Sequence, residues 1–184
     1  VLQETGEYKF TKDSSINVSG KNAAAIDLKA PATIIAGGTT LALNVTEASG
    51  NAAGINMGAA GTTQMGANAL AIKTASSNSA YGIFQTAGNN VIDSNIAIEV
   101  SSSANAGASE KTIGVYANDG TLTINGDVNA TVTNNGIGFE HYGSHGLYAT
   151  GKGGSSKGAD IVVNGKVTFA GAGNGLTTNM GGAS

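Results

Sequence analysis

Several residue types that define other protein classes are missing from this sequence of 184 residues. It has no cysteine, which excludes a disulfide framework and thiolate metal sites. It has no arginine, and its net charge is −3, so a basic nucleic-acid surface is not expected. No apolar run is long enough to cross a membrane as a helix.

Bulky side chains are also scarce. The chain has no tryptophan, one proline and 29 glycines, and much of its 40% hydrophobic content is alanine. A wide globular core would be poorly filled by such side chains. A narrow core that is shared among many short strands needs less volume, so the composition favours an elongated architecture.

A four-residue motif, here called the anchor motif, recurs along the chain at a nearly constant step. Its copies are AIDL from Ala25, GINM from Gly54, GIFQ from Gly82, GVYA from Gly114, GLYA from Gly146 and GLTT from Gly175. The steps between copies are 29, 28, 32, 32 and 29 residues. This periodicity is typical of a solenoid, in which one repeat cannot bury its apolar face alone.

An alternating apolar run follows most copies of the anchor motif. The runs are LALNV from Leu41, LAIK from Leu70, IAIEV from Ile96, VNATV from Val128 and VTF from Val167. Another short apolar segment usually lies between the motif and the run, as in TLTI at 121–124 and DIVV at 160–163. Each interval therefore predicts three strands separated by turns.

Residues 114–132, GVYANDGTLTINGDVNATV, show how the repeat changes a local interpretation. By themselves, NDG and NG between alternating runs favour tight hairpin turns. The same punctuation returns one interval later, which indicates that both turns are corners of a coil. The three runs are then expected to pair with neighbouring coils and not with one another.

The predicted fold is an all-β, right-handed parallel β-helix with three short strands per coil and about six coils of roughly 30 residues. Residues 1–20 are rich in charge and are expected to form an N-terminal cap. Residues 21–184 are expected to form the coils. No such cap precedes Ser184, so the chain is expected to be a fragment with further coils beyond it.

The alternation of apolar and polar residues assigns side chains to faces. The residues expected inside are Val115, Leu122, Ile124, Val128 and Val132, with Leu41, Leu70, Ile96 and Val167 stacked around them. The glycine of each anchor motif is expected at a corner. One outward column is expected to contain Asp27, Asn56, Phe84, Tyr116, Tyr148 and Thr177, and another Ala42, Ala71, Ala97, Asn129 and Thr168.

The pattern of G-[IVL]-[YF]-A, a glycine-containing corner, T-[LIV]-x-[IV]-N-G and an alternating run covers most of residues 80–170. It resembles the coils of autotransporter passenger domains of Gram-negative bacteria. The resemblance implies export through the outer membrane by a C-terminal barrel and a location at the cell surface or in the medium. It also implies roles in adhesion, self-association or virulence.

Catalysis has little support in the residues. The segment FEHYGSHG holds Glu140, His141, Tyr142 and His145, but a solvated loop explains it better than a metal site, and no metal or cofactor is expected. The acids are scattered, whereas glycoside hydrolysis needs a pair of carboxylates. Pectate-lyase-like enzymes resemble this fold but rely on a basic residue, usually arginine, and on clustered aspartates. Neither is present, and no G-D-S-G protease motif occurs.

Binding is the better hypothesis. Phe84, Tyr116 and Tyr148 are expected to form an exposed line of three rings, either as simple ladder stacking or as a contact stripe for a glycan or protein. His141, Tyr142 and His145 are candidate binding residues because a loop that projects from a regular rod often carries function. The flat column of alanine, asparagine and threonine suits self-association between passengers.

Three functions therefore remain open from the sequence. The first is a non-enzymatic adhesin or self-association module that binds surface glycans or proteins. The second is a structural stalk that carries a functional domain located elsewhere. The third, which the scattered acids disfavour, is a β-helical carbohydrate-active enzyme.

Overall fold

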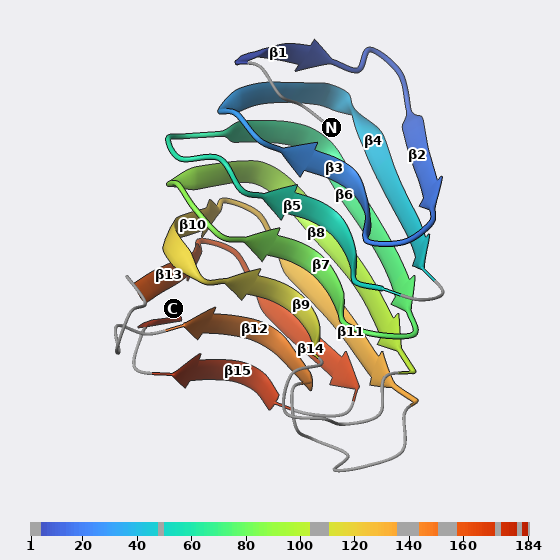
Figure 1. Ribbon diagram of the computed structural model, residues 1–184. Coiled ribbons are helices and arrows are strands. Elements are labelled where there is room, and N and C mark those ends of the chain that lie inside the picture. The colour runs from blue at the N-terminus through green and yellow to red at the C-terminus, as the bar shows by residue number, and fades with distance from the viewer. Residues whose placement is uncertain are drawn as a thin grey trace.

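The computed structural model describes residues 5–47, 50–103, 111–135, 144–150, 158–171, 174–179 and 182–183 (Figure 1). Every regular element in these ranges is a β-strand, and none of the described residues forms a helix that could span a membrane. The strands pair in parallel and stack coil upon coil. The predicted all-β parallel solenoid is confirmed.

One sheet contains six strands, each of which carries one copy of the anchor motif. Its strands are β3 (Ala23–Leu28), β5 (Ala52–Met57), β7 (Ala80–Gln85), β9 (Thr112–Ala117), β12 (Ser144–Thr150) and β15 (Asn174–Asn179). Adjacent strands pair in parallel, with equivalent motif residues as partners. The repeat period in the sequence is therefore the length of one coil.

The remaining strands form a second sheet on the other side of the coil (Figure 1). They are β1 (Gly6–Lys9), β2 (Ser14–Ser19), β4 (Ala32–Glu47), β6 (Gln64–Ser76), β8 (Asn90–Ser102), β10 (Asp119–Ile124), β11 (Val128–Asn134), β13 (Gly158–Val163), β14 (Val167–Gly171) and β16 (Gly182–Ala183). All of their pairings are also parallel.

The number of strands per coil changes along the chain. The second and third predicted strands are separate in β10 and β11 and again in β13 and β14. In the earlier coils they are continuous, as the single strands β4, β6 and β8. The pairing of β4 with β6 shifts between Ala36 and Thr40, where Gly38 has a φ of 75°. The chain therefore bends between the second and third predicted strands both where these strands are separate and where they are continuous. Only the hydrogen bonding across this bend differs between the two cases.

The turns in the 114–132 segment are corners, as predicted. Gly120 has a φ of 74° and Gly88, one coil earlier, has a φ of 86°, a region that side chains with a Cβ rarely adopt. Asn125 and Gly126 separate β10 from β11, and β11 pairs with β8 and β14 of the neighbouring coils. The runs on either side of each turn are therefore not partners of each other.

The coils amount to about four turns, slightly fewer than the six expected. At the two ends, β1 and β2 and then β15 and β16 belong to coils that are incomplete within the described residues. The proposed cap within residues 1–20 supplies β1 and β2, and both pair in parallel with β4. Its boundary at residue 20 stays a prediction.

The core is a set of aliphatic columns that run along the solenoid. One column joins the Cα partners Leu41, Leu70, Ile96, Val128 and Val167, as the alternation predicted. Val115, Leu122, Ile124 and Val132 are fully buried, which confirms their predicted inward orientation. Val167 in β14 is the exception, because 39% of it is exposed at the C-terminal end of its column.

The glycines of the anchor motif do not lie at corners, so that prediction is wrong. Gly54, Gly82 and Gly114 lie in the middle of β5, β7 and β9. A Cβ on Gly82 would come within 2.5 Å of Ile98 Cγ2, which projects from the opposite sheet, and of the Gly114 carbonyl oxygen. The narrow coil requires glycine here because the two sheets approach each other closely.

Polar side chains at the corners bond to the next coil. The Oδ1 atom of Asn95 accepts the backbone N–H of Asp127 at 3.0 Å, and the Oδ1 atom of Asp127 accepts that of Lys166 at 2.8 Å. Asn164 Nδ2 donates to Asn125 Oδ1 at 2.7 Å in a parallel ladder. These bonds reinforce the register of the later coils at corners that lie outside the sheets.

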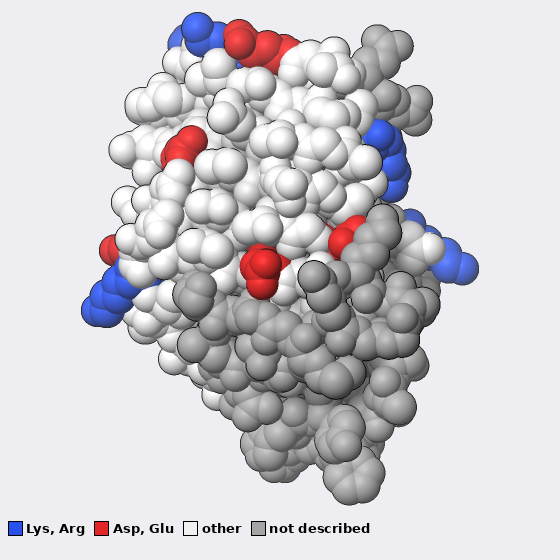
Figure 2. Space-filling view, turned by 90° about the vertical axis from the view of Figure 1, so that its left-hand side faces the viewer, with Lys and Arg blue, Asp and Glu red and all other residues white. Residues whose placement is uncertain are grey.

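Charge is sparse on the surface. On the face drawn in Figure 2, the described charged side chains are few, and blue and red ones adjoin at the top and at the left edge. This distribution follows from the 11% content of charged residues. The described residues on that face form no continuous basic stripe of the kind that nucleic-acid-binding proteins carry.

Candidate functional site

The outward column predicted from the anchor motif exists in the six-stranded sheet. Its successive Cα partners are Asp27, Asn56, Phe84, Tyr116, Tyr148 and Thr177. The column brings three aromatic residues from three successive coils together. The structure therefore assembles Phe84, Tyr116 and Tyr148 as the sequence predicted.

The three rings pack against one another more tightly than an exposed line would. Phe84 and Tyr116 are stacked, with ring centroids 5.2 Å apart and planes at 12°. Tyr116 and Tyr148 are also 5.2 Å apart but tilted by 57°. Tyr116 is only 8% exposed, while Phe84 and Tyr148 are half-buried. The prediction of a fully exposed line is wrong for its central ring, because its neighbours cover it on both sides.

Tyr81 is a fourth aromatic member that the sequence reasoning missed. Its ring stacks on Phe84 at 4.7 Å and lies 5.9 Å from Tyr116. In an unbroken strand, residues three apart point to opposite faces. Tyr81 and Phe84 nevertheless stack on the outer face, and Gly82 between them has no Cα partner in the pairings of β7 with β5 and β9, so the backbone is irregular there. The aromatic residue directly before an anchor glycine was the available signal. Burial raises the pKa of Tyr81, a hydrogen bond with Ser79 opposes the shift, and the charge of Tyr116 adds to it.

His145 belongs to the same cluster and not to a solvated loop. It lies in β12, is only 9% exposed, and its ring stacks on Tyr148 with centroids 4.9 Å apart. Burial lowers the pKa of His145, and the positive charge of Lys111 lowers it further. His141 and Tyr142, the other two candidates from this segment, lie outside the described residues.

Lys111 supplies a positive charge beside the rings. Its Nζ atom lies 5.0 Å from the ring centroids of both Tyr116 and Tyr148, within the range of cation–π interactions. Its backbone N–H donates to Ser79 Oγ at 3.0 Å, which fixes the base of the side chain. Ion pairs among the described residues join Lys29 to Asp27 and Lys73 to Glu99, so Lys111 has no carboxylate partner there.

Polar groups border the rings on the other side. The hydroxyl of Tyr116 donates to Asn118 Oδ1 at 3.3 Å and accepts from Thr150 Oγ1 at 3.1 Å. Asn118 and Thr150 are half-buried. We call the whole set the aromatic face, which consists of Tyr81, Phe84, Tyr116, Tyr148, His145, Lys111, Asn118 and Thr150.

A second surface lies on the outside of β4, β6, β8, β11 and β14, and we call it the flat face. Its predicted column of Ala42, Ala71, Ala97, Asn129 and Thr168 is confirmed as a row of Cα partners. The next column along these strands is Asn44, Lys73, Glu99, Thr131 and Ala170, and Asn17 of β2 continues it beyond Asn44. These side chains are short except for one cation and one anion.

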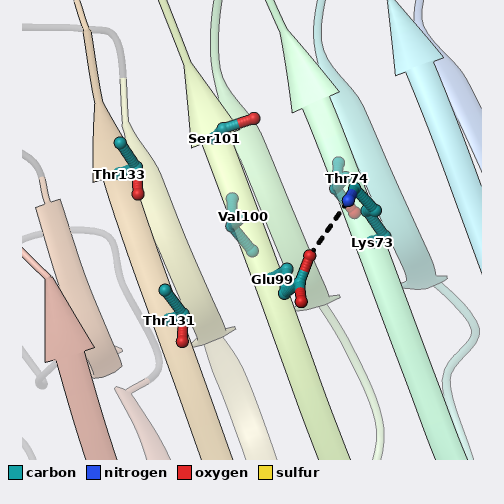
Figure 3. Close-up of a pocket in the computed structure, with 7 residues that line it drawn as sticks. All are labelled: Lys73, Thr74, Glu99, Val100, Ser101, Thr131 and Thr133. Carbon is teal, nitrogen blue, oxygen red and sulfur yellow. Dashed lines mark ion pairs between the residues drawn. The ribbon is translucent and has the colours of Figure 1, made fainter.

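The two charged residues of the flat face border a shallow depression. Lys73 Nζ lies 3.1 Å from Glu99 Oε2, and both side chains are mostly exposed (Figure 3). The depression has a volume of about 240 Å³ and is lined by Lys73, Thr74, Glu99, Val100, Ser101, Thr131 and Thr133. Strands β6, β8 and β11 supply these residues in successive coils. An exposed pair of this kind contributes little to stability, at most about 1 kcal/mol.

Several described acidic residues have structural partners. Asp93 accepts a hydrogen bond from Asn125 Nδ2, Asp127 accepts the Lys166 N–H, and Asp27 pairs with Lys29. No group of three or more histidine, cysteine or acidic residues that could hold a metal ion occurs in the described part of the chain. Glu140 lies outside that part.

Comparison with known proteins adds no relative. No family model, curated protein or solved structure matches the chain. The observed parallel solenoid is compatible with a β-helical passenger domain, which is the fold that the sequence resemblance implied. Membership of the autotransporter family stays a prediction from the repeat.

Proposed function

We propose that this chain is a non-enzymatic binding module of a cell-surface or secreted rod, of the adhesin type found in autotransporter passengers. The observation that carries the proposal is the aromatic face. It joins rings from three successive coils to a lysine without a carboxylate partner among the described residues. Binding surfaces are enriched in such aromatic anchors.

The composition of the aromatic face suits recognition of a ligand more than internal stabilisation alone. A ladder that served only to stabilise the coils could be apolar throughout, like the aliphatic columns of the core. Here Tyr148, Phe84 and Lys111 are half-buried and combine apolar rings with a charge and hydroxyl groups. A few convergent polar groups beside apolar surface are typical of ligand sites.

Export across the outer membrane of a Gram-negative bacterium is the proposed route to the surface. The support is the resemblance of the GVYA and GLYA coils to passenger domains, together with the solenoid fold and the absence of cysteine. The expected partners are surface glycans or proteins. Nucleic acid is not an expected partner, because the net charge is −3 and no arginine is present.

A double substitution, Phe84→Ser with Tyr148→Ser, tests the proposal. Both rings are partly exposed, so their loss removes the contact surface while the main core stays intact. We expect binding to target cells or to a glycan array to weaken at least about tenfold, which corresponds to about 1.4 kcal/mol. Asn129→Ser on the flat face is the matched control and leaves binding unchanged. Unchanged binding by the double variant, with its circular dichroism spectrum preserved, contradicts the proposal.

Self-association through the flat face is a second candidate, favoured by Lys73 and Glu99. They are register partners in adjacent coils and have opposite charges. A surface with one cation beside one anion is complementary to a copy of itself turned by 180°, which is the geometry of an isologous dimer. If neither face binds a partner or a second copy, the remaining function is that of a structural stalk.

A further inference from the structure

We propose that the aromatic face binds an acidic sugar, with its carboxylate at Lys111 and its ring against Phe84 and Tyr148. This inference rests on the proposed binding function and specifies its ligand class. It requires three features of the aromatic face: a positive charge without a carboxylate partner among the described residues, an apolar surface of partly exposed rings beside it, and hydroxyl-binding groups at its border.

The positive charge of Lys111 is available to a ligand. Among the described residues, ion pairs are formed by Lys29 with Asp27 and by Lys73 with Glu99, and Lys111 takes part in neither. The acid of the aromatic column, Asp27, is already engaged because it also accepts a hydrogen bond from Asn56 Nδ2 at 2.7 Å. A ligand carboxylate would give Lys111 the charge-assisted hydrogen bonds that it lacks.

The ammonium group is also held in place. Its Nζ atom lies 5.0 Å from the centroids of both Tyr116 and Tyr148, so two rings attract it from different coils. A long side chain that is already ordered loses less conformational entropy when a ligand binds. The ring contacts direct the ammonium group over the aromatic face, beside the surface on which a sugar ring would lie.

The rings and their polar border provide the rest of the site. Phe84 and Tyr148 are half-buried and flank the covered Tyr116 ring. The hydroxyl of Tyr116, with Asn118 Oδ1 at 3.3 Å and Thr150 Oγ1 at 3.1 Å, offers donors and acceptors for sugar hydroxyls. Apolar rings with a few placed polar groups are the usual composition of a small-molecule site.

A neutral sugar would leave Lys111 without a counter-charge, and a purely anionic ligand would not use the rings. The combination of a lysine with aromatic rings therefore favours a sugar that carries a carboxylate, such as a uronic acid or a sialic acid. An acidic peptide would satisfy Lys111 but not the ring surface. This difference separates the two ligand classes in the experiment below.

The test uses two matched pairs of probes with the whole chain: tri-galacturonate and its methyl ester, and sialyllactose and lactose. Titration calorimetry or a glycan array measures the affinities. The acidic member of at least one pair is expected to bind about tenfold more tightly than its neutral counterpart. This preference is expected to decrease as salt rises, because the attraction is between charges.

Lys111→Gln keeps the stem of the side chain and removes its charge. It is expected to abolish the preference for the acidic member, while Lys111→Arg retains it and Lys73→Gln on the flat face leaves it unchanged. Phe84→Ser with Tyr148→Ser is expected to lower the affinity for both members of a pair. An acidic hexapeptide of glutamates serves as the non-sugar probe and is expected to bind at least tenfold more weakly than the acidic sugar.

Three results overturn the inference. They are equal binding of the acidic and neutral members by the unchanged chain, a preference that survives in Lys111→Gln, and a glutamate peptide that binds as well as the sugar. If the chain binds neutral sugars and loses them in the ring variant, the acidic-sugar inference fails and the binding function stands. If no probe binds, the inference fails, and the cell-adhesion assay decides the binding function separately.

Discussion

Gly82 shows how a single missing Cβ permits the coil to close. It lies in the middle of β7, and a methyl group there would meet Ile98 Cγ2 and the Gly114 carbonyl oxygen at 2.5 Å. The carbonyl belongs to a neighbouring coil and cannot move without disturbing the sheet. Tyr81 and Phe84 on the outer face also depend on the irregular backbone at this position.

Gly82→Ala is therefore expected to destabilise the protein by about 1–3 kcal/mol, the usual range for overpacking. The measurement is the midpoint of chemical unfolding. Gly66→Ala is the control, because Gly66 lies in β6 with no atom within 4 Å of the added Cβ. It should be neutral or stabilising by less than about 1 kcal/mol. Equal effects of the two substitutions would contradict the close-approach explanation.

His145 makes stability depend on pH. Burial, and then Lys111, lowers the pKa of His145 below its ordinary value of 6.5. As pH falls through about 6.5, the unfolded chain takes up a proton that the folded chain resists, so the free energy of unfolding decreases. The decrease stops below the folded pKa, where both states are protonated.

We expect His145→Gln to remove this part of the pH dependence. Urea unfolding at several pH values between about 7.5 and 5 measures it for both proteins. The difference in unfolding free energy between the two proteins should shrink steadily as the pH falls. Parallel pH profiles would show that His145 does not titrate differently in the folded chain.

At the scale of the elements, the strands depend on polar side chains at the bend that leads into the second sheet. Asn90 begins β8 and is only 2% exposed. Its Oδ1 atom accepts the Thr63 N–H at 2.9 Å, and its Nδ2 atom donates to Gln85 Oε1 at 2.9 Å. Gln85 is fully buried and donates in turn to the Asp119 carbonyl oxygen at 2.8 Å. One network thus joins three successive coils.

Asn90→Ala is expected to cost about 2–4 kcal/mol, because it leaves buried donors and acceptors without partners. Asn95→Ala is the comparison, since Asn95 is exposed and accepts a single backbone N–H, that of Asp127, at 3.0 Å. Water can replace that bond, so a loss of about 1 kcal/mol is expected. Thermal or urea unfolding measures both. A smaller effect at Asn90 than at Asn95 would show that the buried network is dispensable.

At the scale of the whole molecule, the flat face determines whether rods associate. If two copies pack face to face about a two-fold axis, Lys73 of each copy meets Glu99 of the other. Lys73→Glu and Glu99→Lys each place two like charges on the face. Each variant alone is expected to be monomeric, whereas an equimolar mixture is expected to form mixed dimers, because one surface is acidic and the other basic.

Sedimentation velocity of the unchanged chain, each variant and the mixture measures this outcome. Lys29→Glu, away from the flat face, is the control and should behave like the unchanged chain. Dimers in the single variants would place the interface elsewhere. If every sample is monomeric at high concentration, the flat face is an ordinary solvated surface, which is what the stalk interpretation predicts.

The sequence by itself determined the fold class and the stacking of side chains in columns. A constant repeat and a two-residue alternation allow few strand registers, because a shift of one residue in the pairing of a strand would turn its core side chains toward solvent. For that reason Phe84, Tyr116 and Tyr148 could be placed in one column, and the NDG and NG turns could be assigned to corners. Lys73 and Glu99 were not singled out, since their pairing appears only when the coils are in register.

Only the tertiary structure decided how closely the sheets approach and what the aromatic column touches. The anchor glycines lie in mid-strand because side chains from the opposite sheet fill the coil. The irregular backbone beside Gly82 adds Tyr81 to the outer face, and neighbouring rings cover Tyr116. His145 joins them from the position before its anchor glycine, which is in one register column with Tyr81, whereas Lys111 precedes β9 and has no partner in the strand registers. The alternation of residue types in the sequence indicates on which face of a strand a residue lies. Burial depends on the distances between coils and between sheets, and the repeat period does not determine these distances.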